Sequence, residues 1–177
     1  MTPELIRELV FYNPDTGDMI WRERDRKYFS KDCSHKTWNT KYAGKPAVTK
    51  DGKGYRVITI FGKRYLVHRL AWLYMHGEWP EIIDHINGDK LDNRLCNLRS
   101  VTQQQNHMNN RLASNNTSGV TGVYFNKLRA IWCAQMKFNG ETYHLGSSPI
   151  FEEAVAMRKA EEKRLGFSKR HGEKSAR

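Results

Sequence analysis

The spacing of hydrophobic and polar residues in the first half of the chain predicts a series of short elements. Residues 4–12 fit a short helix, and the turn-forming sequence NPDTGD leads into a strand at 19–24. From there to about residue 41 the pattern has no clear period, and we expect a basic loop. GYRVITIFGKRYLVHR, residues 54–69, then places β-prone side chains on both sides of an FGKR turn, which predicts a hairpin.

A helix is predicted directly after this hairpin. In RLAWLYMHG the side chains of Leu70, Leu73 and Tyr74 fall on one side of a helix, and Gly77 is suited to end it. Pro80 prevents any continuation.

A capping-box sequence marks the start of the next helix. Thr102 and Gln105 have the S/T-x-x-E/Q spacing in which each side chain bonds the backbone amide of the other residue. We therefore expect a helix from Gln103 to about Leu112. The small polar residues that follow, ASNNTSG, predict a linker and a domain boundary.

After the linker the pattern predicts three strands and one helix. Residues 131–138 alternate in the manner of a half-buried strand, and Asn139-Gly140 is a strong hairpin signal because both residues tolerate positive φ. Pro149 is expected at the first helical position, and Gly166 ends the helix. The final segment, SKRHGEKSAR, is expected to be a disordered basic tail.

Composition favours small modules in a soluble protein. The 38% hydrophobic share of the 177 residues is low for one large core, and no hydrophobic run approaches the roughly 18 residues of a membrane span. The N-terminus is too polar for a signal peptide. Cys33, Cys96 and Cys133 form no C-x-x-C pair, which argues against a disulfide framework or a cysteine zinc site. A reducing compartment, the cytoplasm, is the simplest expectation.

The net charge of +11 is unevenly distributed. Residues 22–69 carry fourteen lysines and arginines against four acidic residues, a net charge of +10. Aromatic residues lie between them: Trp21, Tyr28, Phe29, Trp38, Tyr42 and Tyr55. Nucleic acid is the polyanion that best suits such a surface, although ordinary solubilising charge is the alternative.

Acidic and amide side chains gather around one histidine in IDHINGDKLDNRLCNL, residues 83–98. A calcium loop of the EF-hand type does not fit, because Gly88 at its sixth position would put Ile83 and Arg94 at two ligand positions. A polar loop whose side chains bond its own backbone does fit. A metal site is the other possibility.

A longer spacing favours the metal site. Asp84 and His85 fall on a short strand, Asn97 follows twelve residues after His85, and Asn106 nine residues after that. The stretch from VHRLAW through DHINGDKLDNRLCNLRSVTQQQN resembles the HNH nuclease family, in particular its homing-endonuclease-like phage branch. The resemblance implies a ββα-metal finger, two strands and a helix around one divalent ion.

Phosphodiester hydrolysis explains why these residue types are needed. Histidine titrates nearest to neutral pH, so His85 is the natural general base. Asp84 and Asn106 supply oxygen ligands that suit Mg²⁺ or Mn²⁺. The resemblance assigns the same roles and makes Asn97 the residue that spans the loop and orients His85. His107 is an alternative ligand, but the spacing favours Asn106.

Residues around this motif are further candidates. His68 in LVHRL contacts a phosphate or only caps and packs, with packing slightly favoured, and Asn93 ties the loop. Arg69, Arg94 and Arg99 are predicted to bind the DNA backbone.

Residues 119–167 resemble the ethylene-response-factor (ERF) type of DNA-binding domain. The resemblance rests on SGVTGV, WCAQMKF, YHLG and FEEAVAMRKA, and implies that the open face of a three-stranded sheet enters the major groove. Alternation puts Trp132, Ala134, Met136 and Phe138 on the helix side. The side chains expected to face DNA are Lys127, Arg129, Gln135, Lys137, Thr142 and His144. Thr142 and His144 differ from the residues that contact DNA in the plant ERF domains, so whether this module reads bases stays open. The alternative is a stable βββα unit that does not bind DNA.

The sequence thus predicts an α+β protein. The expected segments are an N-terminal basic β-containing region (1–66), the HNH core (67–112), the linker (113–118), the βββα module (119–167) and the tail (168–177). The expected function is a divalent-metal endonuclease that acts on double-stranded DNA as a monomer in a bacterial or phage-infected cell, without a membrane or obligate protein partner. Cleavage would leave 5′-phosphate and 3′-hydroxyl ends, as the resemblance implies. The alternatives are a non-catalytic DNA-binding regulator with a degenerate loop and, with less support, an RNA-binding protein.

Overall fold

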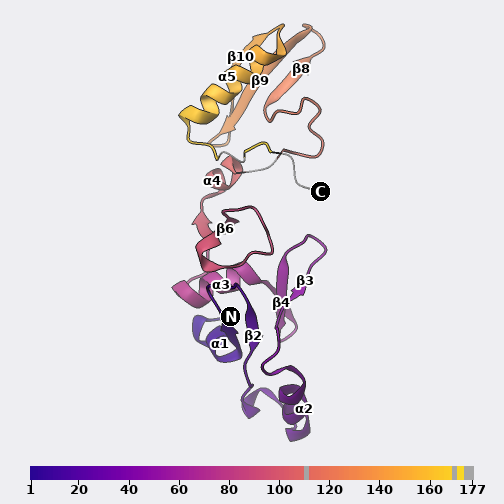
Figure 1. Cartoon of the computed structure of the whole chain (residues 1–177), viewed down its shortest axis with the longest axis vertical. Coiled ribbons are helices and arrows are strands. Elements are labelled where there is room, and N and C mark those ends of the chain that lie inside the picture. Colours follow the sequence, from indigo (N-terminus) through magenta and orange to yellow (C-terminus); the bar gives the residue numbers. More distant parts are fainter. Residues whose placement is uncertain (110–111, 169–170, 174–177) are drawn as a thin grey trace. The chain divides into compact units, whose positions relative to one another are not determined.

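The computed structural model describes residues 1–109, 112–168 and 171–173 (Figure 1). It is a mixed α+β structure of small sheets and helices, as predicted. The chain divides into two compact units, Met1–Val101 and Thr102–Arg177. Within the described ranges, no helix has the length and hydrophobicity to cross a membrane.

The first unit contains three small antiparallel sheets, β1–β2, β3–β4–β5 and β6–β7. Its helices are α1 (Pro3–Leu9), the 3-10 helix η1 (Arg26–Tyr28), α2 (Asp32–Tyr42), α3 (Val67–His76) and the 3-10 helix η2 (Leu95–Asn97). Its strands are β1 (Val10–Tyr12), β2 (Met19–Trp21), β3 (Thr49–Lys50), β4 (Arg56–Ile60), β5 (Lys63–Leu66), β6 (Ile82–His85) and β7 (Leu98–Val101).

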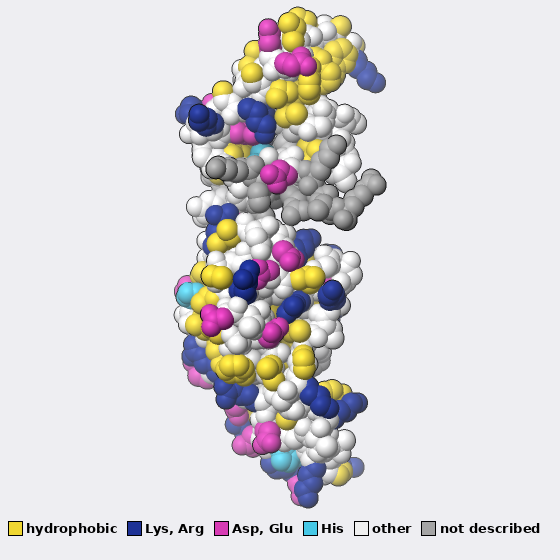
Figure 2. All heavy atoms as spheres, viewed as in Figure 1, with side chains coloured by type: hydrophobic (Ala, Val, Ile, Leu, Met, Phe, Trp, Pro, Cys, Tyr) yellow, Lys and Arg dark blue, Asp and Glu magenta, His cyan; other side chains and the backbone are white. Residues whose placement is uncertain are grey.

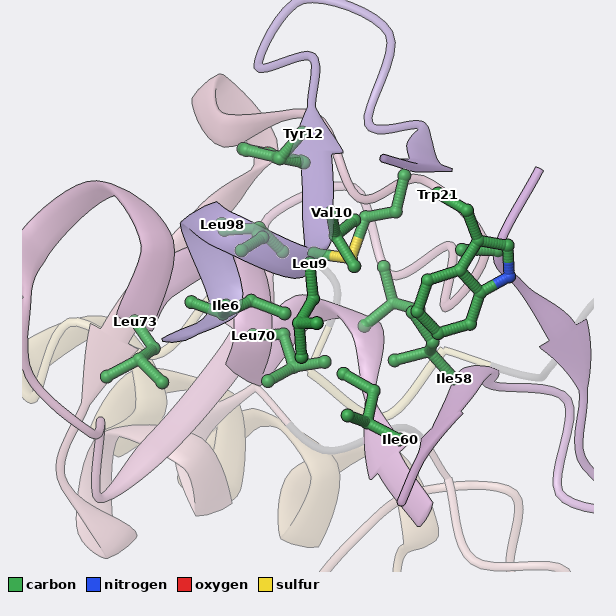
Figure 3. Packing of buried hydrophobic residues seen from close by; sticks show 14 residues of the cluster. Ile6, Leu9, Val10, Tyr12, Trp21, Ile58, Ile60, Leu70, Leu73 and Leu98 are labelled. Atoms are coloured by element: carbon green, nitrogen blue, oxygen red, sulfur yellow. The ribbon is translucent and has the colours of Figure 1, made fainter. Parts of the chain in front are cut away.

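The core of this unit forms where α1 and α3 pack together with the first strands. Ile6 and Leu9 of α1 and Leu70 of α3 are fully buried in one cluster, which Figure 3 shows from close by. The helix α3 ends where predicted, because Gly77 adopts the left-handed conformation (φ 78°) and its N–H bonds the Leu73 carbonyl. The core also contains Leu98 of β7. It therefore holds α3, which precedes β6, and β7, which follows the loop after β6.

Two predictions for the N-terminal region are wrong. The helix predicted over 4–12 ends at Leu9, and the chain continues as strand β1. The expected basic loop contains the helix α2, which buries none of its residues completely. The helix contacts the rest of the unit through Trp38, whose ring meets Trp21 edge-on at 5.5 Å and lies 3.9 Å from the Arg24 guanidinium. Asn39 also bonds the backbone of Arg24. Contacts of this kind leave no periodic hydrophobic stripe in the sequence.

The second unit contains a three-stranded antiparallel sheet in the order β10–β9–β8. Its elements are α4 (Gln103–Met108), β8 (Val123–Asn126), β9 (Ile131–Phe138), β10 (Glu141–Ser148) and α5 (Phe151–Arg164). The helix α5 packs on one face of the sheet, where Ala154 meets Ala134 and Val123 in a small core (Figure 1).

The turn and cap signals of this unit are confirmed. Thr102 and Gln105 form both hydrogen bonds of the capping box at the start of α4. Asn139 and Gly140 have φ of 51° and 84°, as a tight hairpin turn requires. The helix α4 ends at Met108, with Asn109 as its C-cap, so the prediction that it runs to about Leu112 is wrong. Residues 110 and 111 lie outside the described residues.

Two details of this unit differ from the predictions. The helix α5 begins at Phe151 rather than at Pro149, because Ile150 has extended backbone angles (φ -99°, ψ 125°) and forms the N-cap. The Ser148 hydroxyl accepts the Ile150 N–H. The tail is not disordered at His171, which is buried at 7% exposure. The other tail residues 169–170 and 174–177 lie outside the described residues.

A buried ionic cluster joins α5 to the sheet and to the tail. Arg158 is 3% exposed and its guanidinium donates to Glu162 (2.9 Å) and to the Gln135 carbonyl (3.0 Å). A further nitrogen of Arg158 lies 3.3 Å from His171 Nε2. Removing the arginine would leave the Glu162 carboxylate buried without its buried ion-pair partner, which would lower the free energy of unfolding.

We predict that Arg158→Ala lowers the free energy of unfolding by about 3–5 kcal/mol, the usual effect of breaking a buried ion pair. Arg164→Ala is the matched control, because Arg164 also pairs with a glutamate on α5 but its side chain is 68% exposed. Urea unfolding followed by circular dichroism should show a large decrease for the first variant and almost none for the second. Equal effects would mean that the cluster does not stabilise the unit.

Candidate active site

The carboxylate of Asp84 lies on β6 beside an arginine of the neighbouring strand. In the antiparallel pairing of β6 with β7, Asp84 lies directly opposite Arg99. Asp84 Oδ2 accepts hydrogen bonds from Arg99 Nε (2.9 Å) and Nη2 (2.7 Å), and the Asp84 side chain is 12% exposed. This pairing fixes the orientation of the carboxylate on the sheet. The contact of Arg99 with DNA stays a prediction.

His85, the next residue, lies in a different environment. It is 6% exposed, its ring meets the His68 ring edge-on at 5.0 Å, and Tyr55 lies 6.4 Å away. Its Nε2 lies 3.4 Å from Asn93 Oδ1. Burial lowers the pKa of His85 below the usual histidine value, and this outweighs the Asn93 hydrogen bond and the nearby Asp84 charge. A neutral imidazole of this kind can accept a proton at neutral pH.

His68 forms part of the wall behind His85. It lies in the first turn of α3, is 5% exposed, and its Nδ1 has no hydrogen-bond partner among the described residues. Burial lowers its pKa to about 3, helped by the charges of His85 and Arg69. These observations agree with the packing role, while its contact with DNA stays a prediction.

The loop from β6 to β7 is closed by Asn97. Its Oδ1 accepts the Asn87 N–H (2.9 Å), and its Nδ2 donates to the Asp92 carbonyl (2.8 Å). Asn97 thus spans the loop as predicted. The side chain that faces His85 Nε2 is Asn93, which the sequence singled out only as a loop tie.

The two other arginines predicted to bind DNA have structural partners. Arg94 donates through Nε and Nη2 to Asp92, and this hydrogen bonding holds the pKa of Asp92 well below its usual range. Arg69 donates to the carbonyls of Glu81 (3.0 Å) and Pro80 (2.8 Å), directly before β6. Both residues shape the segment that carries Asp84, and their DNA contacts remain untested.

Asn106 lies in the second unit, in the middle of α4. The N–H of Asn106 bonds the Thr102 carbonyl, so the capping box fixes its place on the helix. His107, the alternative ligand, lies with its Nε2 3.0 Å from the Gln103 side chain one turn earlier. Among the residues that the structure describes, no group of three or more His, Cys, Asp and Glu gathers as a metal site. The predicted ligand set, with one carboxylate and one amide, fits an ion that keeps most of its water.

The sheet of the second unit carries the residues predicted to face DNA. Thr142 lies opposite Lys137 and His144 opposite Gln135, which puts these four side chains on one face of β9 and β10. Lys137, Thr142 and His144 are exposed and Gln135 is half-buried. Lys127 and Arg129 are exposed in the turn between β8 and β9. The opposite face is covered by α5, so the predicted alternation of Trp132, Ala134 and Met136 toward the helix agrees with their burial.

We predict that His68 makes the protein sensitive to acid. Its folded-state pKa of about 3 lies below the ordinary 6.5, so the unfolded chain binds more protons between these values and stability falls as the pH drops below 6.5. When the pH falls from about 7 to about 5, the free energy of unfolding should decrease in both proteins. The decrease should be up to about 2 kcal/mol smaller in His68→Leu than in the wild type. His76→Leu, which removes an exposed histidine of the same helix, is the control in urea unfolding at both pH values. A wild-type pH slope in His68→Leu would contradict the prediction.

Comparison with known proteins identifies the relatives of the chain. The family described as HNH endonuclease matches residues 65–108. Protein 3.8 of Escherichia phage T7 is 31% identical over 87 residues, which cover 48% of this chain and 72% of that protein. An uncharacterized HNH endonuclease of Acanthamoeba polyphaga mimivirus is 34% identical over 106 residues, 59% of this chain and 54% of that protein. No solved structure matches. Together, the family match over the β6–β7 loop and the similarity to viral proteins show that this chain contains an HNH endonuclease family domain at residues 65–108 and has viral homologues.

Proposed function

We propose that the protein is a metal-dependent endonuclease that hydrolyses phosphodiester bonds of double-stranded DNA. The observation that carries the proposal is the buried imidazole of His85, with its lowered pKa, directly after a carboxylate in the segment that matches the HNH endonucleases. A neutral base and an oxygen ligand side by side are what the hydrolysis of a phosphodiester needs.

In this proposal His85 is the general base. The imidazole takes a proton from the attacking water as the oxygen of the water bonds to phosphorus. The wall made by His68 and Tyr55 excludes solvent from the ring on that side and keeps it neutral before the reaction. The proton is released to solvent after cleavage.

Asp84 and Asn106 are the proposed ligands of one divalent ion, Mg²⁺ or Mn²⁺. When bound, such an ion supplies a Lewis acid that neutralises charge on the scissile phosphate. Asp84 suits this role because a carboxylate is a hard oxygen ligand that accepts several partners, in addition to the two hydrogen bonds from Arg99. Arg99 then holds the carboxylate in one orientation.

The sheet of the second unit is proposed as an ERF-like DNA anchor. Its exposed residues Lys127, Arg129, Lys137, Thr142 and His144 offer phosphate and base contacts from one face. Tethering this anchor to the nuclease segment raises the effective concentration of DNA at the site. One site per chain favours nicking by a monomer, with 5′-phosphate and 3′-hydroxyl products, in the cytoplasm of a bacterial or phage-infected cell.

One observation favours a second candidate function, a DNA-binding regulator without turnover. Arg99 holds Asp84 through two hydrogen bonds, as it would in a loop that has kept only a structural role. Such a protein would bind DNA and leave it intact. The two functions therefore separate in a cleavage assay.

We predict that wild-type protein converts supercoiled plasmid into relaxed or linear DNA with Mg²⁺ and not with EDTA. His85→Ala should cleave roughly 100 to 10,000 times more slowly, the usual contribution of a general base, while its affinity for DNA stays the same. His76→Ala is the control, because it removes an exposed histidine outside the site. Binding without cleavage by wild-type protein would support the regulator instead.

The salt dependence of binding tests the proposed anchor. Each phosphate contact contributes about 0.9 to the slope of log K against log salt concentration, so Lys127→Ala should lower the slope by about that amount. Lys163→Ala, an exposed lysine in the last turn of α5, should leave the slope unchanged. A filter-binding or anisotropy titration at several salt concentrations measures this, and identical slopes would exclude Lys127 from the interface.

A further inference from the structure

Asn93 is buried more deeply than any other polar side chain among the described residues, with 1% of its surface exposed. Its polar groups have partners inside the protein. Nδ2 donates to the Leu91 carbonyl (3.1 Å), the backbone carbonyl accepts from the Tyr12 hydroxyl (2.8 Å), and Oδ1 faces His85 Nε2 (3.4 Å). These contacts at the amide nitrogen, the amide oxygen and the backbone carbonyl fix the side chain in one orientation.

This orientation determines which nitrogen of His85 carries the proton. The bond from Nδ2 to Leu91 leaves the amide oxygen facing the imidazole, and an amide oxygen can only accept. His85 Nε2 must therefore donate, which puts the proton on Nε2 and the lone pair on Nδ1. Nδ1 is then the atom of the neutral ring that can take a proton from water.

Asn93 is in turn held by the N-terminal hairpin of β1 and β2. The Tyr12 hydroxyl bonds its carbonyl, and the Pro14 carbonyl accepts the Leu95 N–H (2.9 Å). Gly17 lies against the same stretch at φ 75°, and a Cβ there would be 2.6 Å from the Asn93 carbonyl carbon. Only glycine fits both this φ and this distance.

The turn itself is rigid enough to act as a support. Asn13 Oδ1 accepts the N–H of Asp15 (2.9 Å), and the Gly17 N–H bonds the Asn13 carbonyl (2.9 Å). The strands on both sides are anchored in the core through Val10, Tyr12 and Met19. Tyr12, a residue of the hydrophobic core, thus contacts Asn93, and Asn93 contacts His85.

We propose that the N-terminal turn, residues 12–17, is a positioning element of the nuclease site, which acts by fixing Asn93 and through it the Nε2-protonated form of His85. Tyr12, Gly17 and Asn93 are positioning residues, since none of them is placed at the reacting atoms. The proposal rests on the proposed function, in which His85 is the base. It assigns a role in the reaction to a segment outside the part of the chain that matches the HNH family.

The first test compares Tyr12→Phe with Tyr74→Phe. Both variants lose one phenol hydroxyl, and the two rings touch edge-on at 5.7 Å, but the bond to Asn93 comes from Tyr12. Tyr12→Phe should lower kcat about tenfold, with the KM and the dissociation constant for DNA within about twofold of wild type. Tyr74→Phe should keep the wild-type kcat. An unchanged kcat in Tyr12→Phe, or an equal loss of kcat and DNA affinity, would overturn the proposal.

The second test reads the proton position directly and needs no cleavage. A long-range ¹H–¹⁵N spectrum at mildly alkaline pH distinguishes the two forms of neutral histidine, and His85→Ala identifies the signals of His85. We expect the Nε2-protonated form in wild-type protein and a mixture of both forms in Asn93→Leu and Gly17→Ala. A proton on Nδ1 in wild-type protein refutes the proposal even if a variant does not fold. If wild-type protein shows the Nε2 form but no nuclease activity, the positioning of His85 stands and the proposed function fails.

Discussion

The loop between β6 and β7 must satisfy its backbone polar groups without a regular sheet or a long helix, and the site depends on how it does so. A buried N–H or C=O without a partner costs about as much as a lost hydrogen bond, so short polar side chains supply the partners. Asn87 Oδ1 accepts the Asp89 N–H (2.8 Å), and Asp89 Oδ1 accepts the Leu91 N–H (2.9 Å). Asn97 then joins the two ends. The concentration of acidic and amide residues in this loop follows first from backbone chemistry.

The structural and catalytic interpretations of this loop are therefore compatible. Consecutive residues of a strand point in opposite directions, and β6 uses this to place Asp84 beside Arg99 and His85 against His68 and Tyr55. Asp84 is held in an ion pair, while burial lowers the pKa of His85. The roles proposed for these two residues, a metal ligand and a neutral base, therefore suit the different surroundings of two adjacent strand positions.

Features with a local signal could be predicted from the sequence. The end of α3 at Gly77, the capping box at Thr102 and the Asn139-Gly140 turn each depend on residues a few positions apart. The spacing of the HNH residues likewise predicted the HNH endonuclease domain, whose family model matches residues 65–108. Features made by distant residues were missed: α2 depends on Arg24 and Trp21, and Tyr12 bonds a carbonyl 81 residues away. Such contacts leave no repeating hydrophobic pattern in the sequence, because each involves one side chain at one position.

The N-terminal charge also has to be considered residue by residue. Lys27 pairs with Glu8, Arg56 with Asp18, and Arg24 lies over the Trp38 ring, so part of the +10 of this region is used within the unit. Figure 2 shows acidic side chains between the lysines and arginines on the face in view.

Exposed lysines such as Lys31, the N-cap of α2, and Lys36 within it would add attraction for DNA that depends on salt and not on sequence. A surface of mixed charge attracts DNA over a wide area and does not fix the position of the protein along the DNA sequence. In the proposed anchor, base selection would have to come from side chains that reach base edges, and Lys137, Thr142 and His144 are exposed on one face of β9 and β10.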